Sequence, residues 1–184
     1  ADGREYREND VRLACLYAFG KRRKKVFIPE YFSSAAERIA ADNGFSVRRI
    51  SFSSADRYLL FNFTDPAFCA AELMAYIAES GERFRDILCR FPDISVSSER
   101  LSVSGKAKII SELSLLPGAK RYSGAIRIIS SKQNGGTAIF PTADSRGFKV
   151  IAEAANAETA RALCEFYVNK IKTVAEKVKN DTTE

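Results

Sequence analysis

The residues best suited to chemistry lie close together in the last third of the chain. They are two hydroxyl-bearing and two cationic residues: Thr142, Ser145, Arg146 and Lys149. Hydroxyl groups donate hydrogen bonds, and Arg and Lys supply charge, so this set favours an anion such as a phosphate. An ordinary polar hairpin would contain the same residue types, and that alternative stays open. We assign no catalytic residue.

The absence of histidine restricts the chemistry further. The 184 residues contain no His, which excludes Ser-His-Asp and Cys-His catalysis and removes the commonest ligand of transition metals. The four cysteines, Cys15, Cys69, Cys89 and Cys164, form no C-x-x-C pair, so we expect no bound metal. Each lies in an apolar segment, and we expect four buried free thiols in a reducing compartment.

Other charged residues have structural explanations. Asp65 precedes Pro66 and is expected to cap a helix rather than to transfer a proton. The basic run 21–25 is expected to be a solvated helix end whose cations complement the helix C-terminus, rather than a patch for polyanions. The net charge of +6 is mild and spread over both halves, so we expect no nucleic-acid partner.

Composition indicates a folded, soluble protein. The hydrophobic content of 46% and the charged content of 28% are ordinary for such proteins. No apolar run approaches the ~20 residues that cross a bilayer, and no secretory signal is visible. We therefore expect a cytoplasmic location and no membrane partner. Because residue 1 is Ala rather than Met, we also expect that the chain was cut from a longer protein.

The elements that position these residues fall into two groups, and the first alternates helices with strands. Apolar spacing predicts helices over 9–20, 34–43, 65–79 and 82–90, and strands over 26–28 and 45–52. The strand–helix–strand order predicts a parallel pair with a helical crossover. Gly20 is expected to end the first helix, and residues 53–64 are expected to be irregular.

The second group predicts an α+β unit. An edge strand or linker over 93–104 precedes a helix over 105–116. Three strands follow, over 125–129, 137–140 and 148–152, and Asn156 caps a final helix over 156–178. The apolar stripe Leu163, Tyr167 and Ile171 should pack the last helix on the sheet. We predict a small α/β domain over 1–92, and over 93–184 an antiparallel sheet with helices on one face.

Residues 134–154 read Asn-Gly-Gly-Thr-Ala-Ile-Phe-Pro-Thr-Ala-Asp-Ser-Arg-Gly-Phe-Lys-Val-Ile-Ala-Glu-Ala. This stretch resembles the C-terminal domain of the α-D-phosphohexomutases (phosphomannomutase and phosphoglucomutase), in which a glycine hairpin, a strand and a phosphate-binding loop lead to a strand ending in Ala-Glu-Ala. The first half is similar to the third domain of that family in its strand 26–29 before Ser33-Ser34 and in its Asp-led helices over 65–92. The resemblance implies a third-domain-like unit over 1–92 and a C-terminal-domain-like unit over 93–184.

The departures from the family pattern point away from catalysis. The phosphoserine loop and the Asp-rich metal loop of active mutases do not lie in this chain, and the sugar-recognition loop Gly-Glu-x-Ser-Gly-His has no counterpart. Phe140 stands where the family's phosphate loop has an Arg, and each lost charged hydrogen bond is worth about 1.5–3 kcal/mol. Asp144 puts a carboxylate where a phosphate would sit, a repulsion of ~4 kcal/mol at ~4 Å and an effective dielectric of ~20.

This degenerate loop is similar to the corresponding loop in the mutase-like tails of bacterial mannose-1-phosphate guanylyltransferase-type nucleotidyltransferases. The same tails are similar in the segment before an apolar helix, which here reads Gly105-Lys106-Ala107-Lys108. The resemblance implies a non-catalytic module of a larger sugar-nucleotide enzyme. Its partners would be the N-terminal domains of the parent polypeptide and a weakly bound sugar phosphate, held by Thr142, Ser145, Arg146 and Lys149. It implies no cofactor here, although the parent family uses Mg²⁺. The alternative is the C-terminal part of an active phosphomannomutase or phosphoglucomutase, an intramolecular phosphotransferase.

Overall fold

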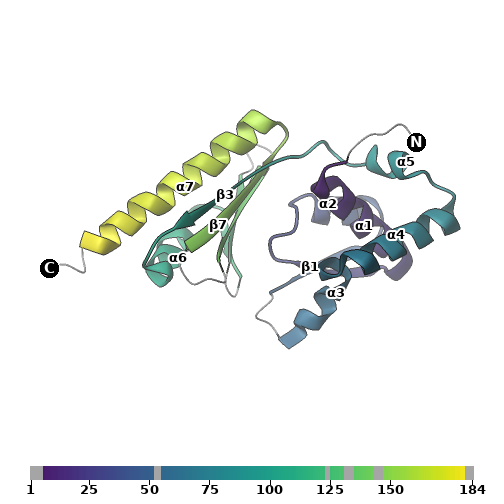
Figure 1. The fold of residues 1–184 in the computed structure, drawn as a ribbon, viewed down its shortest axis with the longest axis horizontal. Helices are drawn as coiled ribbons and strands as arrows, with labels where there is room; N and C mark the ends of the chain where they lie inside the picture. Colours follow the sequence, from purple (N-terminus) through teal and green to yellow (C-terminus); the bar gives the residue numbers. More distant parts are fainter. Residues whose placement is uncertain (1–5, 52–54, 123–124, 131–134, 143–146, 181–184) are drawn as a thin grey trace. The chain divides into compact units, whose positions relative to one another are not determined.

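Figure 1 shows the protein as a computed structural model that describes residues 6–51, 55–122, 125–130, 135–142 and 147–180. The chain divides into two compact units, Ala1–Pro92 and Asp93–Glu184. The division falls where the sequence pattern changes from alternating helices and strands to a series of strands between two helices.

The first unit places helices against a two-stranded parallel sheet. Its elements are α1 (Glu8–Arg23), β1 (Lys25–Pro29), α2 (Ala36–Asp42), β2 (Ser46–Ile50), the 3-10 helix η1 (Ala55–Leu60), α3 (Phe61–Thr64), α4 (Pro66–Ser80) and α5 (Phe84–Leu88). Strands β1 and β2 pair in parallel with α2 between them, which confirms the expected crossover. The segment expected to be irregular before α4 contains η1 and α3 instead.

Helix α1 continues past the glycine that was expected to end it. The helix runs to Arg23, and Lys24 closes it in a left-handed conformation with φ 61°. Gly20 has a packing role instead, because a Cβ there would lie 2.5 Å from ring atoms of Phe45. The expected end at Gly20 is therefore wrong, and the ring of Phe45 explains why a residue without a side chain lies inside the helix.

The basic run at the end of α1 is joined to α4 by ion pairs. Arg22 contacts Glu72 at 2.6 Å and Glu79 at 3.2 Å, and Arg23 contacts Glu72 at 3.1 Å. The carboxylate of Glu72 is 19% exposed, which shields these pairs partly from water. The run is thus not merely a solvated helix end, although its cations do lie in the last turn of α1, where they complement the helix C-terminus.

Arg49, on β2, holds the segment between β1 and α2. Its side chain is 5% exposed. The guanidinium donates to four backbone carbonyl oxygens at distances of 2.8–3.4 Å, those of Pro29, Glu30, Phe32 and Ser33. It also forms a bidentate pair with Glu37 on α2, with N–O distances of 2.7 and 2.9 Å. One side chain therefore donates to four carbonyl groups of this connection, of which those of Pro29 and Ser33 also accept from the N–H groups of Phe32 and Ala36.

Helix α4 begins at the cap that the sequence predicts. The side-chain oxygen Oδ1 of Asp65 accepts hydrogen bonds from the N–H groups of Ala67 and Phe68 at 2.9 and 3.1 Å. Pro66 occupies the first helical position, where its missing N–H costs nothing. The cap at Asp65 and the proline at the first helical position thus determine where helix α4 begins.

We predict that replacing Asp65 with Ala lowers the free energy of unfolding by about 1 kcal/mol, because two N–H groups of the first turn lose their acceptor. Urea unfolding followed by circular dichroism measures the loss. Asp65→Asn keeps an acceptor oxygen and should retain most of the stability. An Asn variant as unstable as the Ala variant would show that the charge, and not the capping hydrogen bonds, stabilises this end.

The second unit is a five-stranded antiparallel sheet with two helices. Its elements are β3 (Ser95–Ser102), α6 (Lys106–Ser114), β4 (Ala119–Arg121), β5 (Ile126–Ser130), β6 (Gly135–Pro141), β7 (Gly147–Ala154) and α7 (Ala157–Asn180). The strands lie in the order β3-β7-β6-β5-β4, and all neighbours are antiparallel. The segment predicted to be an edge strand or a linker contains the edge strand β3, whereas the short strand β4 was not predicted.

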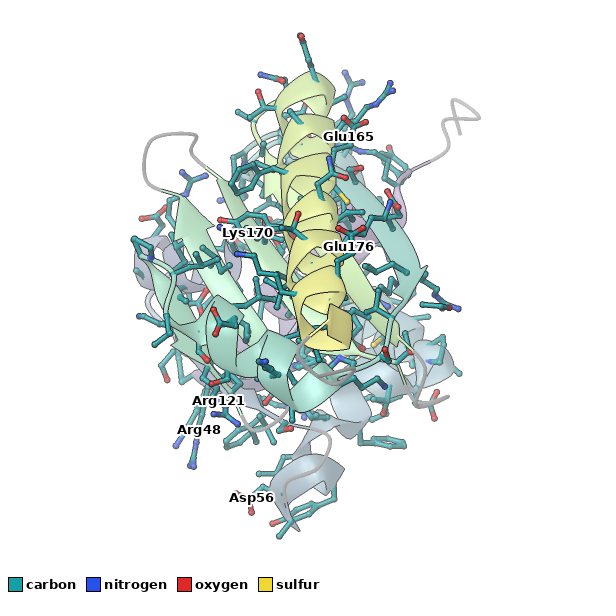
Figure 2. The ribbon with its side chains drawn as sticks, turned by 90° about the vertical axis from the view of Figure 1, so that its left-hand side faces the viewer. Arg48, Asp56, Arg121, Glu165, Lys170 and Glu176 are labelled. Carbon is teal, nitrogen blue, oxygen red and sulfur yellow. The ribbon has the colours of Figure 1, made fainter. Side chains whose placement is uncertain are left out.

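Both helices cover the same face of this sheet. Figure 2 looks onto α7, which lies over the sheet with Glu165, Lys170 and Glu176 on its exposed side. The core contains side chains of β7, the predicted α7 stripe, and residues of α6: Phe148, Val150, Ala152, Leu163, Tyr167, Ile171, Ile109 and Leu113. This confirms the predicted fold class and the packing of the last helix on the sheet. No helix in the described ranges is both long and apolar enough to span a bilayer.

Candidate anion-binding site

The turn between β6 and β7 carries the predicted anion contacts. Thr142 directly follows β6, and its N–H donates to the carbonyl oxygen of Gly147, the first residue of β7, at 3.0 Å. This hydrogen bond joins the two ends of the turn. Ser145 and Arg146 lie outside the described residues, as does Asp144. Of the four predicted site residues, the structure therefore places Thr142 and Lys149.

A lysine of α6 reaches the same turn. Lys106 is the first residue of α6, and its Nζ donates to the carbonyl oxygen of Thr142 at 3.3 Å. The residue before it, Gly105, adopts φ 80° and offers no side-chain cap, and the first turn of α6 contains no acidic residue. Since a helix N-terminus carries partial positive charge, lysines in this turn add like charge and favour an anion nearby. Lys106 precedes an apolar helix in the sequence, but nothing in the sequence alone assigns it to the site.

Lys149 lies on the sheet face opposite the helices. In the ladder it pairs with Phe140 on β6 and with Arg100 on β3, and directly paired residues point to the same face. Its neighbours in sequence, Phe148 and Val150, point into the core. Lys149 and Arg100 thus place two cations side by side, an arrangement that destabilises a sheet by itself and that an anion would relieve. Arg100 was missed because its strand lies far away in sequence.

Phe140 is half-buried beside this pair of cations. It occupies the position at which the resemblance places a phosphate-gripping arginine. The structure brings Thr142 together with Lys106, and Lys149 together with Arg100 and Phe140. Each of these two sets can attract an anion by charge and hydrogen bonding. In the parts of the chain that the structure describes, no group of three or more Cys, Asp and Glu side chains is placed to hold a metal ion.

No family model matches the sequence, and no curated protein matches it. Solved structures, however, share its fold. The N-acetylphosphoglucosamine mutase of Aspergillus fumigatus, in complex with GlcNAc-6P and magnesium, matches with a TM-score of 0.56 and 12% sequence identity, over 95% of this chain and 46% of its own. A phosphoglucomutase/phosphomannomutase family protein from Burkholderia thailandensis matches with a TM-score of 0.62 and 12% identity, over 91% of this chain and 42% of its own.

These matches show that the chain has the phosphohexomutase fold, as the resemblance in sequence implied. Its antiparallel sheet with two helices corresponds to the C-terminal domain of that fold. The chain spans less than half the length of either solved structure.

Proposed function

We propose that this chain is a degenerate phosphohexomutase-like module without catalytic activity of its own, within a larger bacterial enzyme of sugar-nucleotide metabolism. In that enzyme a nucleotidyltransferase domain precedes the mutase-like tail. The observation that carries the proposal is Phe140, a half-buried apolar ring at the position of the family's phosphate-binding arginine. The shared fold supports descent from a mutase, and the altered loop supports the loss of its chemistry.

The ligand class that suits the remaining contacts is a hexose phosphate, bound weakly. Its phosphate would be held by the Lys106 ammonium and the Thr142 hydroxyl, with Ser145, Arg146 and Lys149 as further donors. All of these groups bind and orient; none is assigned a proton-transfer role. The module needs no cofactor, and the Mg²⁺ of the mutase family would belong to other domains of a mutase. We place the parent enzyme in the cytoplasm.

We predict that mannose 1-phosphate and glucose 1-phosphate bind with a Kd of about 1 mM or weaker, which corresponds to about 4 kcal/mol. Titration followed by NMR should shift backbone signals of the β6–β7 turn. Lys106→Ala and Arg146→Ala should each weaken binding several-fold. Lys120→Ala, which removes an exposed cation of β4, is the matched control and should leave the affinity unchanged.

Two results would contradict this prediction. Micromolar binding that Arg146→Ala abolishes would mean that the turn has been rebuilt for a ligand. Binding that Lys120→Ala weakens as much as Lys106→Ala does would mean that only overall charge attracts the sugar phosphate.

The alternative, that the chain is the C-terminal part of a working mutase, agrees equally well with the fold that it shares with these solved structures. The coding sequence upstream of Ala1 distinguishes the two. A phosphoserine loop and an Asp-rich metal loop there, together with interconversion of mannose 1-phosphate and mannose 6-phosphate by the full polypeptide, would establish the alternative. A nucleotidyltransferase domain without mutase turnover is the result that our proposal predicts.

A further inference from the structure

Two cysteines meet where α1 packs against α4 (Figure 1). Cys15 is 3% exposed, and its Sγ donates to the carbonyl oxygen of Cys69 at 3.8 Å. The two thiols also lie close enough for each to shift the pKa of the other. The two residues are 54 positions apart in sequence, and neither forms a disulfide. The fold of the first unit therefore brings two distant thiols into contact.

The surroundings make the two thiols chemically different. Cys69 is half-buried, whereas Cys15 is enclosed. The hydrogen bond from Cys15 lowers the pKa of the Cys69 thiol, and the charge of Arg12 lowers it further, against the opposing effects of burial and of Asp65. The same hydrogen bond and burial raise the pKa of Cys15. Because the thiolate is the nucleophile, Cys69 is the attacking thiol of the pair.

We propose that Cys15 and Cys69 form a dithiol site that low-molecular-weight disulfides of the glutathione class oxidise reversibly. The Cys69 thiolate attacks one sulfur of the small disulfide, and a new S–S bond forms while one glutathione thiolate leaves. The Cys15 thiol then loses its proton to solvent and attacks Cys69 Sγ, which releases the second glutathione thiolate. The protein loses two protons and two electrons, and one small disulfide gains them to become two thiols.

The product would be a covalent link between α1 and α4, the two helices that the ion pairs of Arg22 and Arg23 also join. A link across a chain segment of this length restricts the unfolded state strongly. Oxidation should therefore make the first unit harder to unfold and leave its native fold intact.

The other two cysteines provide internal controls. Cys89 is exposed, which corrects the expectation that all four thiols are buried, as does the half-buried Cys69. Cys164 is buried in the second unit, and burial raises its pKa. Cys89 should thus form a mixed disulfide with glutathione, because nothing places a second thiol beside it among the described residues. Cys164 should stay reduced.

The test treats the reduced, folded chain with glutathione disulfide, blocks remaining thiols by alkylation, and maps tryptic peptides by mass spectrometry. Trypsin places each cysteine in a different peptide: 13–21, 58–83, 86–90 and 162–170. We expect peptide 13–21 joined to peptide 58–83, with a mass about 2 Da below the sum of the two free peptides. Dithiothreitol should separate them again. The control Cys89→Ser should give the same link, and Cys69→Ser should leave Cys15 unreacted until the chain is denatured.

Three outcomes would overturn the proposal. One is glutathione found on Cys69 while Cys15 remains a free thiol. Another is a link that forms only in urea. The third is oxidised Cys89→Ser protein that unfolds at a lower urea concentration than its reduced form, which would mean that the bond distorts the native helices. The peptide map of the oxidised wild-type protein shows whether Cys15 and Cys69 are linked even where Cys69→Ser does not fold.

Discussion

Replacing Arg49 with Met should lower the free energy of unfolding of the first unit by about 3–5 kcal/mol. The change would leave the carbonyl oxygens of Pro29, Glu30, Phe32 and Ser33 without the donor that they share. Met fills much of the same volume, so the loss would come from the missing hydrogen bonds rather than from a cavity. The carbonyl oxygens of Pro29 and Ser33 keep the N–H groups of Phe32 and Ala36 as donors. The ion pair with Glu37 should contribute little to this loss, because that carboxylate is 52% exposed.

Neighbouring substitutions separate this effect from a general loss of charge. Arg48→Met removes an exposed cation from the same strand and should change stability by less than about 0.5 kcal/mol. Arg49→Lys keeps the charge but lacks the planar fork, so its stability should lie between those of wild type and Arg49→Met. Urea unfolding followed by circular dichroism gives the free energies, and hydrogen exchange should show faster exchange over 25–50. An Arg49→Met protein as stable as Arg48→Met would refute this account of the connection.

The second large effect is expected at Gly147, the first residue of β7. A Cβ at this position would collide with the carbonyl oxygen of Leu101 and would lie 2.9 Å from the carbonyl carbon of Leu101 and 3.1 Å from Cα of Ser102. All three are backbone atoms of β3, so no side-chain rotation relieves the clash. Gly147→Val should therefore lower the free energy of unfolding by about 2–3 kcal/mol, because β3 must move away from β7.

Ser102→Val provides the matched control. Ser102 is the register partner of Gly147 and is exposed, and a β-branched residue suits an exposed strand position. The free energy of unfolding of the Ser102→Val variant should be equal to or slightly above that of the wild type in the same urea experiment. If Gly147→Val were as stable as Ser102→Val, the close approach of the two strands would not matter for the sheet.

The features that the sequence predicts well depend on neighbours in the chain. Asp65 and Asn156 cap their helices as expected, because a cap needs only the next three residues. The same reasoning failed at Gly20, where the ring of Phe45 from a distant segment favours a glycine within the helix. It also could not predict β4, a three-residue strand without an apolar pattern that exists because β5 provides its hydrogen-bond partners.

The residues of the candidate site also differ in whether the sequence alone could predict them. Thr142 and Lys149 stand out in the sequence because they flank one turn. Lys106 and Arg100 reach that region only through the order of the strands and the position of α6. The role of Arg49 was not predicted either, because its hydrogen-bond partners are backbone carbonyl groups whose positions depend on the conformation of the connection between β1 and α2.

The strand order of the second unit has a consequence for behaviour at high concentration. An open sheet has two free edges, and a free edge can recruit strands of other molecules and start aggregation. Here one edge is β3, whose exposed residues include Ser98, Glu99 and Arg100. The other is β4, which is only three residues long and contains exposed Lys120 and Arg121. Charge on one edge and brevity on the other discourage such intermolecular pairing, so the unit can leave its sheet open and still remain dispersed.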